Sequence, residues 1–277
     1  MRKISLVILY FISLICFPLK IFFNKNIKHY LYQALRLNLR YFVINKKEIF
    51  FYSPNSVISW RLDTLFTKEP DTLKWISNFP KKNNITFWDI GANIGLYSIY
   101  ASIINKKCRV YAFEPSFLNL YFLSKNIFKN SLVEKISIIQ SPLDIKKNKF
   151  LKFFESSDFE GGAFNSFNQK NSKKIKNAYN ILGLSAEQLI DSKIVKLPNY
   201  IKIDVDGNEF KVLKSFGKYL NHKDIKEILV EIDKDNNQEK KIVNLLTKKG
   251  YFIYKKISTR FEENSADNTF NYFFKKK

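Results

Sequence analysis

Cysteine is scarce in this chain, with only Cys16 and Cys108 among 277 residues. Two such distant cysteines form neither a disulfide framework nor a zinc-binding set, which excludes disulfide-rich scaffolds and zinc fingers. Cys108 lies at the edge of an expected strand and is interpreted as a structural residue. A reducing compartment is therefore expected.

Two common phosphate-binding motifs are also missing. The chain has neither the G-x-G-x-x-G fingerprint of dinucleotide-binding proteins nor the Gly-Lys-Ser/Thr ending of a P-loop. Its glycine-bearing turn, residues 91–95, follows Asp89, whose negative charge repels phosphate and suits a cationic or hydroxyl-rich ligand. A dinucleotide is therefore not the expected ligand of this turn.

Acidic residues are few, with 25 Asp and Glu against 47 Lys and Arg and a formal net charge of +22. One explanation is an anionic partner: a membrane surface, an acidic glycan or a nucleic acid. The lysines are scattered along the chain, however, which favours a general compositional bias. The sequence contains no helix-turn-helix, zinc-finger or RNA-recognition pattern, so no nucleic-acid partner is expected.

The N-terminus carries a long apolar stretch, residues 4–19, which follows Arg2 and Lys3. Lys20 interrupts this stretch before residues 21–23 resume it. Its length is therefore borderline for a membrane-spanning helix, which needs about 20 apolar residues. The residues around Cys16 are not the small ones that a cleaved signal peptide requires.

Three interpretations of this stretch stay open: a short membrane anchor, a helix lying on the bilayer, or a helix folded onto the domain. Bulky apolar residues with flanking lysines favour membrane contact through residues 4–23. The expected location is the cytoplasm, with attachment to the inner face of the membrane in the first two interpretations. We divide the chain into this segment (1–23), a helical and hairpin extension (24–80) and one α/β domain (81–277).

A strand, a tight turn and a helix follow one another between residues 85 and 104. The apolar run that ends with Asp89 and Ile90 predicts a buried strand, and residues 94–104 predict a helix. Such a junction is where an open α/β sheet meets a nucleotide-like ligand. Gly91 and Gly95 let the backbone approach that ligand closely, and the helix N-terminus presents free amides.

The next expected strand, residues 109–113, ends in Glu114. An acidic residue at this distance from the glycine turn is placed to accept hydrogen bonds from both hydroxyls of a ribose. Pro115 and Ser116 then begin a helix. Asp89 or Glu114 alone is an ordinary helix-capping carboxylate, but together with the turn they indicate a ligand site.

Three carboxylates cluster after the expected strand 200–203. Asp204 and Asp206 follow the strand directly, and Glu209 enters the first turn of the next helix. Clustered acids raise one another's pKa, which helps a carboxylate act as a base. The same carboxylates are also able to hold a divalent cation that polarises a hydroxyl, or simply to cap the helix.

Several motifs follow one another from about residue 48 to the end. They are Arg61, Lys68–Thr72, Trp75-Ile76, Trp88–Gly95, Tyr111–Ser116, Ile201–Glu209 and Asn271–Phe274. In their order and spacing these motifs resemble those of the FkbM-type S-adenosylmethionine-dependent methyltransferases. Two segments depart from the family pattern: Ser141-Pro142-Leu143-Asp144, where Ala-Leu-Ser-Asp is frequent, and Ser185-Ala186-Glu187, where Ser-Leu-Asp is usual.

The resemblance implies a Rossmann-like class I methyltransferase fold, with a mostly parallel seven-stranded sheet and a C-terminal antiparallel hairpin. It implies S-adenosyl-L-methionine as cofactor and a sugar hydroxyl of a surface glycan or glycolipid as acceptor, with no essential metal. The expected catalytic residues are Asp204, Asp206 and Glu209; the expected cofactor-binding residues are Glu69, Asp89, Gly91, Asn93, Gly95, Glu114 and Asp144.

Two other functions remain open on the sequence. Asp204-Val205-Asp206 has the D-x-D form that binds a metal-bound diphosphate in nucleotide-sugar glycosyltransferases, although Glu114 and the glycine turn then lack a role. A membrane-tethered binding module with an inactive site is the other alternative, which the intact acidic cluster disfavours. Residues 155–180 are polar and glycine-bearing and are expected to form a loop on the substrate side.

Overall fold

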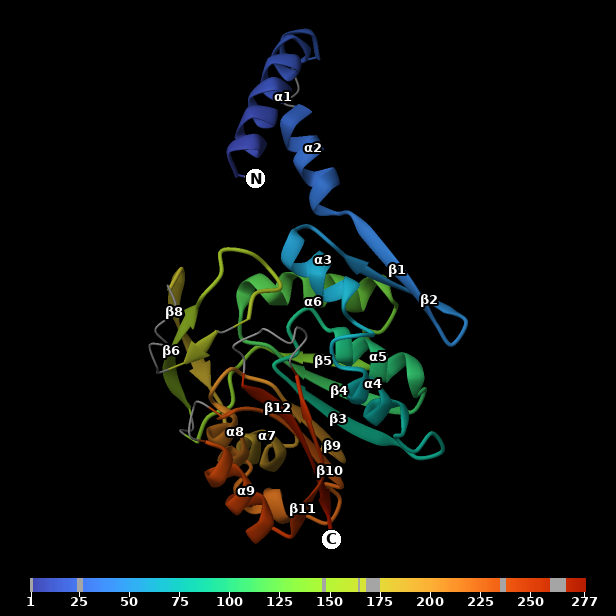
Figure 1. The fold of residues 1–277 in the computed structure, drawn as a ribbon, viewed down its shortest axis with the longest axis vertical. Coiled ribbons are helices and arrows are strands. Elements are labelled where there is room, and N and C mark those ends of the chain that lie inside the picture. The colour runs from blue at the N-terminus through green and yellow to red at the C-terminus, as the bar shows by residue number, and fades with distance from the viewer. Residues whose placement is uncertain are drawn as a thin grey trace.

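The computed structural model describes residues 2–23, 27–145, 148–163, 165–167, 175–234, 238–259 and 268–277. Its centre is a seven-stranded sheet in the order β11-β12-β10-β9-β3-β4-β5 (Figure 1). Of these seven strands, only β12 runs in the opposite direction to the others, since it pairs antiparallel with both β10 and β11. The expected Rossmann-like class I methyltransferase fold with its reversed hairpin is confirmed. The strands are β3 (Ile85–Ile90), β4 (Cys108–Phe113), β5 (Ile136–Ile139), β9 (Tyr200–Ile203), β10 (Glu227–Asp233), β11 (Tyr251–Ser258) and β12 (Thr269–Lys276).

Helices cover both faces of this sheet, which explains why every residue of β3 is buried. Successive β3 side chains point to opposite faces, so Phe87 joins one apolar cluster and Trp88 joins another. The pairing of β3 with β4 and β9 places the carboxyl ends of these strands at one edge. The helices are α5 (Leu96–Ile104), α6 (Phe117–Lys129), α7 (Ala186–Asp191), α8 (Glu209–Ser215), α9 (Glu239–Lys248) and a 3₁₀ turn (Gly217–Asn221).

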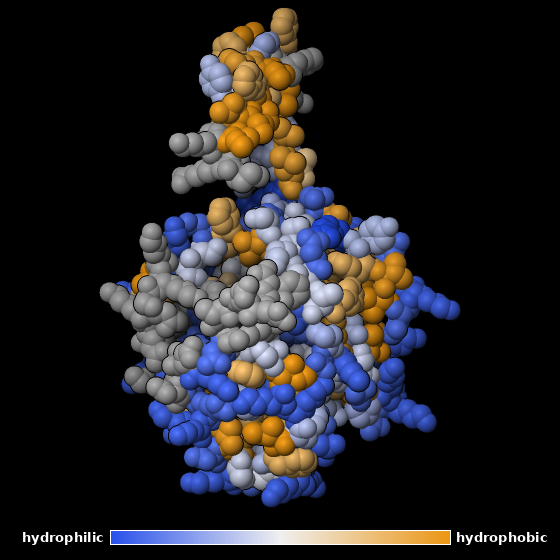
Figure 2. Space-filling model, in the orientation of Figure 1, coloured by the Kyte–Doolittle hydropathy of each residue, from blue (hydrophilic) through white to orange (hydrophobic). Residues whose placement is uncertain are grey.

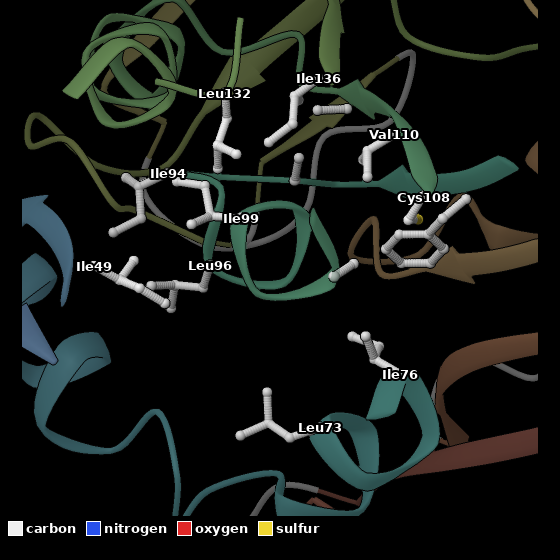
Figure 3. Packing of buried hydrophobic residues seen from close by; sticks show 14 of the residues in the cluster. Ile49, Leu73, Ile76, Ile94, Leu96, Ile99, Cys108, Val110, Leu132 and Ile136 are labelled. Atoms are coloured by element: carbon white, nitrogen blue, oxygen red, sulfur yellow. The ribbon is translucent and has the colours of Figure 1, made fainter. Parts of the chain in front are cut away.

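The extension before the sheet packs into the first of these clusters. Ile49 of the hairpin and Leu73 of α4 are buried together with Leu96 and Ile99 of α5 (Figure 3). The predicted hairpin is present, with its turn at Asn45 and Lys46 in positive φ, and residues 39–80 therefore share one core with the sheet. The elements are β1 (Leu39–Ile44), β2 (Lys47–Tyr52), α3 (Ser56–Asp63) and α4 (Pro70–Ser77).

Two helices precede this hairpin and project from the body, α1 (Arg2–Phe23) and α2 (Ile27–Arg36) (Figure 1). Large apolar side chains of α1 are exposed at neighbouring positions, among them Ile8, Phe11 and Ile15. In Figure 2, many orange side chains lie in the part that projects above the mostly blue body, where Figure 1 places α1 and α2. Among the described residues, no helix combines the length and apolar character needed to cross a membrane.

A small second sheet departs from the expectation for residues 155–180. The predicted strand at residues 150–154 is present as β6. It pairs antiparallel with β8, and the first residues of β8 belong to the segment that was expected to be a loop. The reason is that Ile181 and Tyr179 of β8 pack against Leu151 and Phe153. Residues 164 and 168–174 of the expected loop lie outside the described residues. The strands are β6 (Lys149–Glu155), β7 (Ser166–Phe167) and β8 (Asn177–Gly183).

Candidate active site

A cavity of about 450 Å³ opens at the carboxyl ends of β3, β4, β9 and β10. Ligands of open α/β sheets bind at this edge, which makes the cavity the candidate active site. The structure brings most of the residues expected at the site to its wall and leaves four elsewhere. Those that line it are Gly91, Asn93, Glu114, Asp204, Asp206 and Glu209; those that do not are Glu69, Asp89, Gly95 and Asp144.

The glycine turn brings β3 against the tip of β9. Gly91 has a φ of +88°, and a Cβ atom there would lie 1.8 Å from the Asp204 carbonyl oxygen. The Gly91 amide donates to the Phe113 carbonyl oxygen at 2.9 Å. Gly95, also with positive φ, caps α5 and faces Leu123 instead of the cavity. Gly91 thus supplies the close approach of backbone that shapes the cavity floor.

Glu114 is held in a fixed orientation by backbone amides. Its Oε2 accepts from the Asn93 amide at 2.7 Å, and its Oε1 accepts from the Ser116 amide at 2.9 Å. Burial raises the pKa of Glu114 to about 7, against the opposing effect of these two hydrogen bonds. The carboxylate is therefore buried and oriented, yet it titrates near neutral pH.

Asp89 lies beneath the cavity. It is fully buried, and its Oδ2 accepts the Ser98 hydroxyl at 2.6 Å. Its Oδ1 is also buried and has no hydrogen-bond partner among the described residues. Burial raises the pKa of Asp89, whereas the positive charge of Lys202 opposes the rise. The expected pair of Asp89 and Glu114 therefore shares the sheet edge, but only Glu114 reaches the hollow.

Asp204 is paired with a lysine inside the protein. The Lys202 ammonium lies 2.8 Å from Asp204 Oδ2, and the Lys202 side chain is only 1% exposed. Although burial opposes ionisation, the charge of Lys202 holds the pKa of Asp204 below its usual range. The expectation that clustered acids raise this pKa is wrong for Asp204, because a buried cation outweighs the neighbouring carboxylates.

Glu231, two residues before the end of β10, also lines the cavity and hydrogen-bonds with Asp204. Burial and the charge of Asp204 raise the pKa of Glu231 well above its usual value. The two pKa values therefore shift in opposite directions, because Lys202 lies beside Asp204 and the charge of Asp204 acts on Glu231. The sequence signal for this arrangement was Lys202 itself, because a lysine inside an apolar strand requires a buried partner.

Asp206 and Glu209 occupy the turn that follows. Asp206 adopts a φ of +51°, and Gly207 one of +105°. Glu209 accepts the Gly207 amide at 2.8 Å, and burial raises the pKa of Glu209 to about 7. The turn thus directs both carboxylates toward the cavity and leaves Glu209 able to exchange a proton near neutral pH.

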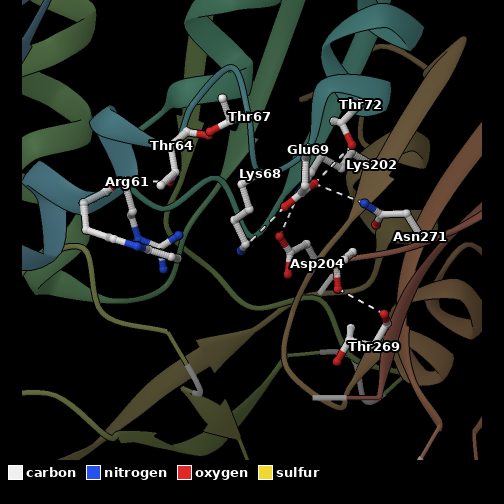
Figure 4. Close-up of polar contacts among 12 residues, drawn as sticks. Arg61, Thr64, Thr67, Lys68, Glu69, Thr72, Lys202, Asp204, Thr269 and Asn271 are labelled. Carbon is white, nitrogen blue, oxygen red and sulfur yellow. Dashed lines mark hydrogen bonds and ion pairs between the residues drawn. The ribbon is translucent and has the colours of Figure 1, made fainter. Parts of the chain in front are cut away.

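The remaining two expected residues are buried beside the cavity. Glu69 precedes α4 and, through Oε2, accepts hydrogen bonds from Thr72 and Asn271, each at 3.1 Å (Figure 4). Glu69 makes no side-chain capping hydrogen bond to the helix. Asp144 is 4% exposed, whereas the three residues before it line the cavity wall. Glu69 and Asp144 are therefore buried and do not line the cavity.

Residues from the segment after β6 line one side of the cavity, and the substrate-side role expected of this segment stays a prediction. Gly162, Ala163 and Asn165 line the cavity. The Gly162 carbonyl oxygen accepts from the Asn93 side chain at 2.9 Å, and the Gly161 carbonyl oxygen accepts from Arg61 Nε at 2.6 Å. Within the described part of the chain, no group of three or more His, Cys, Asp or Glu side chains is arranged to hold a metal ion.

Solved structures with a similar arrangement include a precorrin-6y methyltransferase from Geobacter metallireducens and TYW2 of M. jannaschii solved with AdoMet. The first is 17% identical with a TM-score of 0.45, and the alignment covers 76% of this chain and 87% of that chain. The second is 12% identical with a TM-score of 0.46, and the alignment covers 86% of this chain and 87% of that chain.

Two sequence comparisons agree with each other. The hexuronic acid methyltransferase AglP of Haloferax volcanii is 27% identical over 176 residues, which span 62% of this chain and 65% of that relative. The family model of the methyltransferase FkbM domain matches residues 89–253, from the glycine turn to β11. This match takes in more than half of the chain, which therefore belongs to the FkbM methyltransferase family.

Proposed function

We propose that this protein is an S-adenosylmethionine-dependent O-methyltransferase whose acceptor is a sugar hydroxyl of a surface glycan or glycolipid. The observation that carries the proposal is the carboxylate of Glu114, which two backbone amides orient in the cavity beside Gly91. A buried acceptor of this kind matches the two hydroxyls of a ribose. The family membership of the chain supports the methyl-transfer part of the proposal.

The residues present fit the cofactor. Gly91 leaves room for a ligand where a Cβ atom would meet the β9 backbone. Glu114 would hold the ribose, and the turn residues Gly91 and Asn93 would lie against the methionine part. Asp89 Oδ1 lies buried below this turn without a partner among the described residues and does not line the cavity, so Asp89 stays a prediction as a cofactor contact. Glu69, Gly95 and Asp144, which do not line the cavity either, also stay predictions as cofactor contacts.

When bound, S-adenosylmethionine supplies an electrophilic methyl group, so the protein has to orient an acceptor hydroxyl and remove its proton. Asp204 stays ionised because of Lys202 and is suited to orient the hydroxyl by accepting its hydrogen bond. Glu209 has a pKa raised to about 7 and is the better proton acceptor at neutral pH. Asp206 completes the acidic wall.

The sugar acceptor is supported by a relative whose name states that it methylates a hexuronic acid. Cells with and without the gene would differ by one methyl group on a surface glycan in mass spectrometry. An unchanged glycan profile, together with intact donor binding, would remove the sugar acceptor from the proposal and leave the reaction class in place.

The reaction class is tested by calorimetric titration of S-adenosylmethionine. We expect Glu114→Gln to weaken donor binding about 30-fold or more, because an amide oxygen cannot accept both ribose hydroxyls as a buried carboxylate does. Donor affinity of the native protein should fall as the pH drops below about 7, since protonation of Glu114 removes this acceptor. Glu209→Gln, with a similar starting pKa, is the control that keeps this pH dependence.

The same titration includes nucleotide sugars with and without Mn²⁺, because Asp204-Val205-Asp206 keeps the D-x-D form. Binding of the methyl donor without metal, and no metal-dependent binding of nucleotide sugars, is the result expected here. The reverse result would support the glycosyltransferase alternative. Failure to bind either ligand would favour an inactive binding module.

We also propose that α1 and α2 attach the protein to an anionic lipid surface. Residues 1–47 contain no aspartate or glutamate, whereas lysines and arginines recur among them. Exposed apolar side chains follow one another along α1 and form a continuous patch, whereas single exposed apolar residues are common on soluble proteins. Apolar area next to basic residues is the combination that binds anionic headgroups.

Flotation with vesicles tests this attachment. We expect the full chain to float with vesicles that contain phosphatidylglycerol, and less with pure phosphatidylcholine. Ile8→Asp should reduce the floating fraction about tenfold, because an aspartate in the apolar face opposes insertion. Phe128→Asp changes a side chain of the body that is 76% exposed and should float as the native chain does. Equal flotation of both variants, or a dimer that hides α1, would contradict the attachment.

A further inference from the structure

Two cations enter the cavity from the side opposite the acidic cluster. Arg61 comes from α3 and Lys68 from the segment that follows it, and both line the cavity that Asp204 enters from the sheet (Figure 4). A wall with carboxylates on one side and cations on the other suits a zwitterionic ligand.

The Arg61 side chain is oriented by one hydrogen bond and has N–H donors left for a ligand. Among the described residues its side chain makes one hydrogen bond, from Nε to the Gly161 carbonyl oxygen at 2.6 Å. This bond fixes the guanidinium plane and leaves the terminal Nη groups for a ligand. The charge of Arg61 also acts on Glu114, which places the guanidinium near the expected ribose contact.

Lys68 is only loosely paired. Its ammonium lies 3.7 Å from Glu69 Oε1 and 5.5 Å from the centre of the Trp60 ring, and its side chain is 29% exposed. Glu69 in turn accepts hydrogen bonds from Thr72 and Asn271 with its other oxygen. Lys68 is thus positioned by the wall, and at 3.7 Å it is not committed to one close partner.

We propose that Arg61 and Lys68 bind the amino-acid carboxylate of the methyl donor. A guanidinium with two free terminal groups matches the two oxygens of a carboxylate, and a nearby ammonium adds a point charge. The acidic wall around Asp204 then faces the positively charged parts of the same ligand. This inference rests on the proposed function and assigns two residues that the expected cofactor set did not contain.

Two thioether ligands distinguish contacts to the amino-acid end of the donor from contacts to its adenosine. S-adenosylhomocysteine carries the amino-acid end, whereas 5′-methylthioadenosine has the same adenosine and sulfur without it. We expect Arg61→Met to weaken binding of S-adenosylhomocysteine about 30-fold and Lys68→Met about tenfold in calorimetric titration, since charge-assisted hydrogen bonds are lost. Binding of 5′-methylthioadenosine should change less than about threefold in both variants, because the adenosine contacts stay.

Arg40→Met is the matched control, because Arg40 pairs with Asp63 outside the cavity. This variant should bind both thioethers as the native chain does. Equal weakening of both ligands by Arg61→Met, or no weakening of S-adenosylhomocysteine, would overturn the subsite. Failure of the native chain to bind either thioether would instead overturn the proposed function, so the two failures are distinguishable. Arg61→Lys, which keeps the charge, should recover part of the lost affinity if Arg61→Met is folded.

Discussion

Replacing Gly91 by alanine should both destabilise the protein and abolish donor binding. The added Cβ would lie 1.8 Å from the Asp204 carbonyl oxygen, a backbone atom, and the residue has a φ of +88°. Overpacking together with a left-handed alanine costs about 3 kcal/mol or more. The melting temperature should fall by about 6–12 °C, and donor affinity by more than about 100-fold, because relief of the clash moves the tip of β9.

Gly250→Ala separates backbone strain from the clash. Gly250 has a φ of +83°, but the nearest heavy atoms to its added Cβ lie at an ordinary 3.8 Å, on the Lys276 side chain. Gly250 lies between α9 and β11, away from the cavity. This control should lower the melting temperature slightly and leave donor binding unchanged. If Gly91→Ala behaved in the same way, the close contact of β3 with β9 would not shape the site.

Replacing Lys202 by methionine should cost about 2–3 kcal/mol, because the Asp204 carboxylate, whose side chain is 28% exposed at the cavity, loses the buried cation beside it. In the native chain the pKa of Asp204 is lowered by Lys202, so this carboxylate contributes stability above its unfolded pKa. In the variant, burial without Lys202 raises the pKa of Asp204 in the folded state. The folded protein then loses stability as the pH rises, because the carboxylate must lose its proton. The deficit in melting temperature should therefore be larger at pH 8 than at pH 5.

Thermal melts of Lys202→Met across this pH range decide the point. Lys218→Met removes the lysine of an exposed pair with Asp191 and should leave the melting temperature unchanged. A deficit of Lys202→Met that does not depend on pH would contradict the ion pair and indicate lost packing alone. Loss of methyl transfer without loss of donor binding would place the pair on the acceptor side of the cavity.

The sequence was sufficient for the parts of the site that depend on local order along the chain. The turn after β3, the carboxylate of Glu114 and the acidic turn after β9 each follow a buried strand directly. Parallel pairing then brings the strand ends together at one edge. Local patterns also predicted the hairpin before α3 and the proline that begins α4.

The parts that could not be predicted depend on where a side chain points. Asp89 and Lys202 lie opposite each other in the register of β3 and β9, and both are buried. At the end of a strand, a small change in side-chain direction decides whether a residue lines the cavity or lies beneath it. The pKa of Asp204 is lowered, contrary to the expected rise, because the buried Lys202 lies beside it. Arg61 matched the family pattern, but its entry into the cavity depends on a contact with Gly161, 100 residues away.

The order of strands has a consequence for synthesis of the chain. β12 lies between β10 and β11 and pairs with both, although it is made after them. During translation β11 therefore has no strand to pair with until residues 269–276 leave the ribosome. Until then, the edge of β10 and the edge of β11 that later pair with β12 both stay exposed. Asn271, which donates to Glu69 beside the cavity, arrives with this strand. Thr269 of β12 lines the cavity, so the sheet and this part of the cavity wall are completed in one late event.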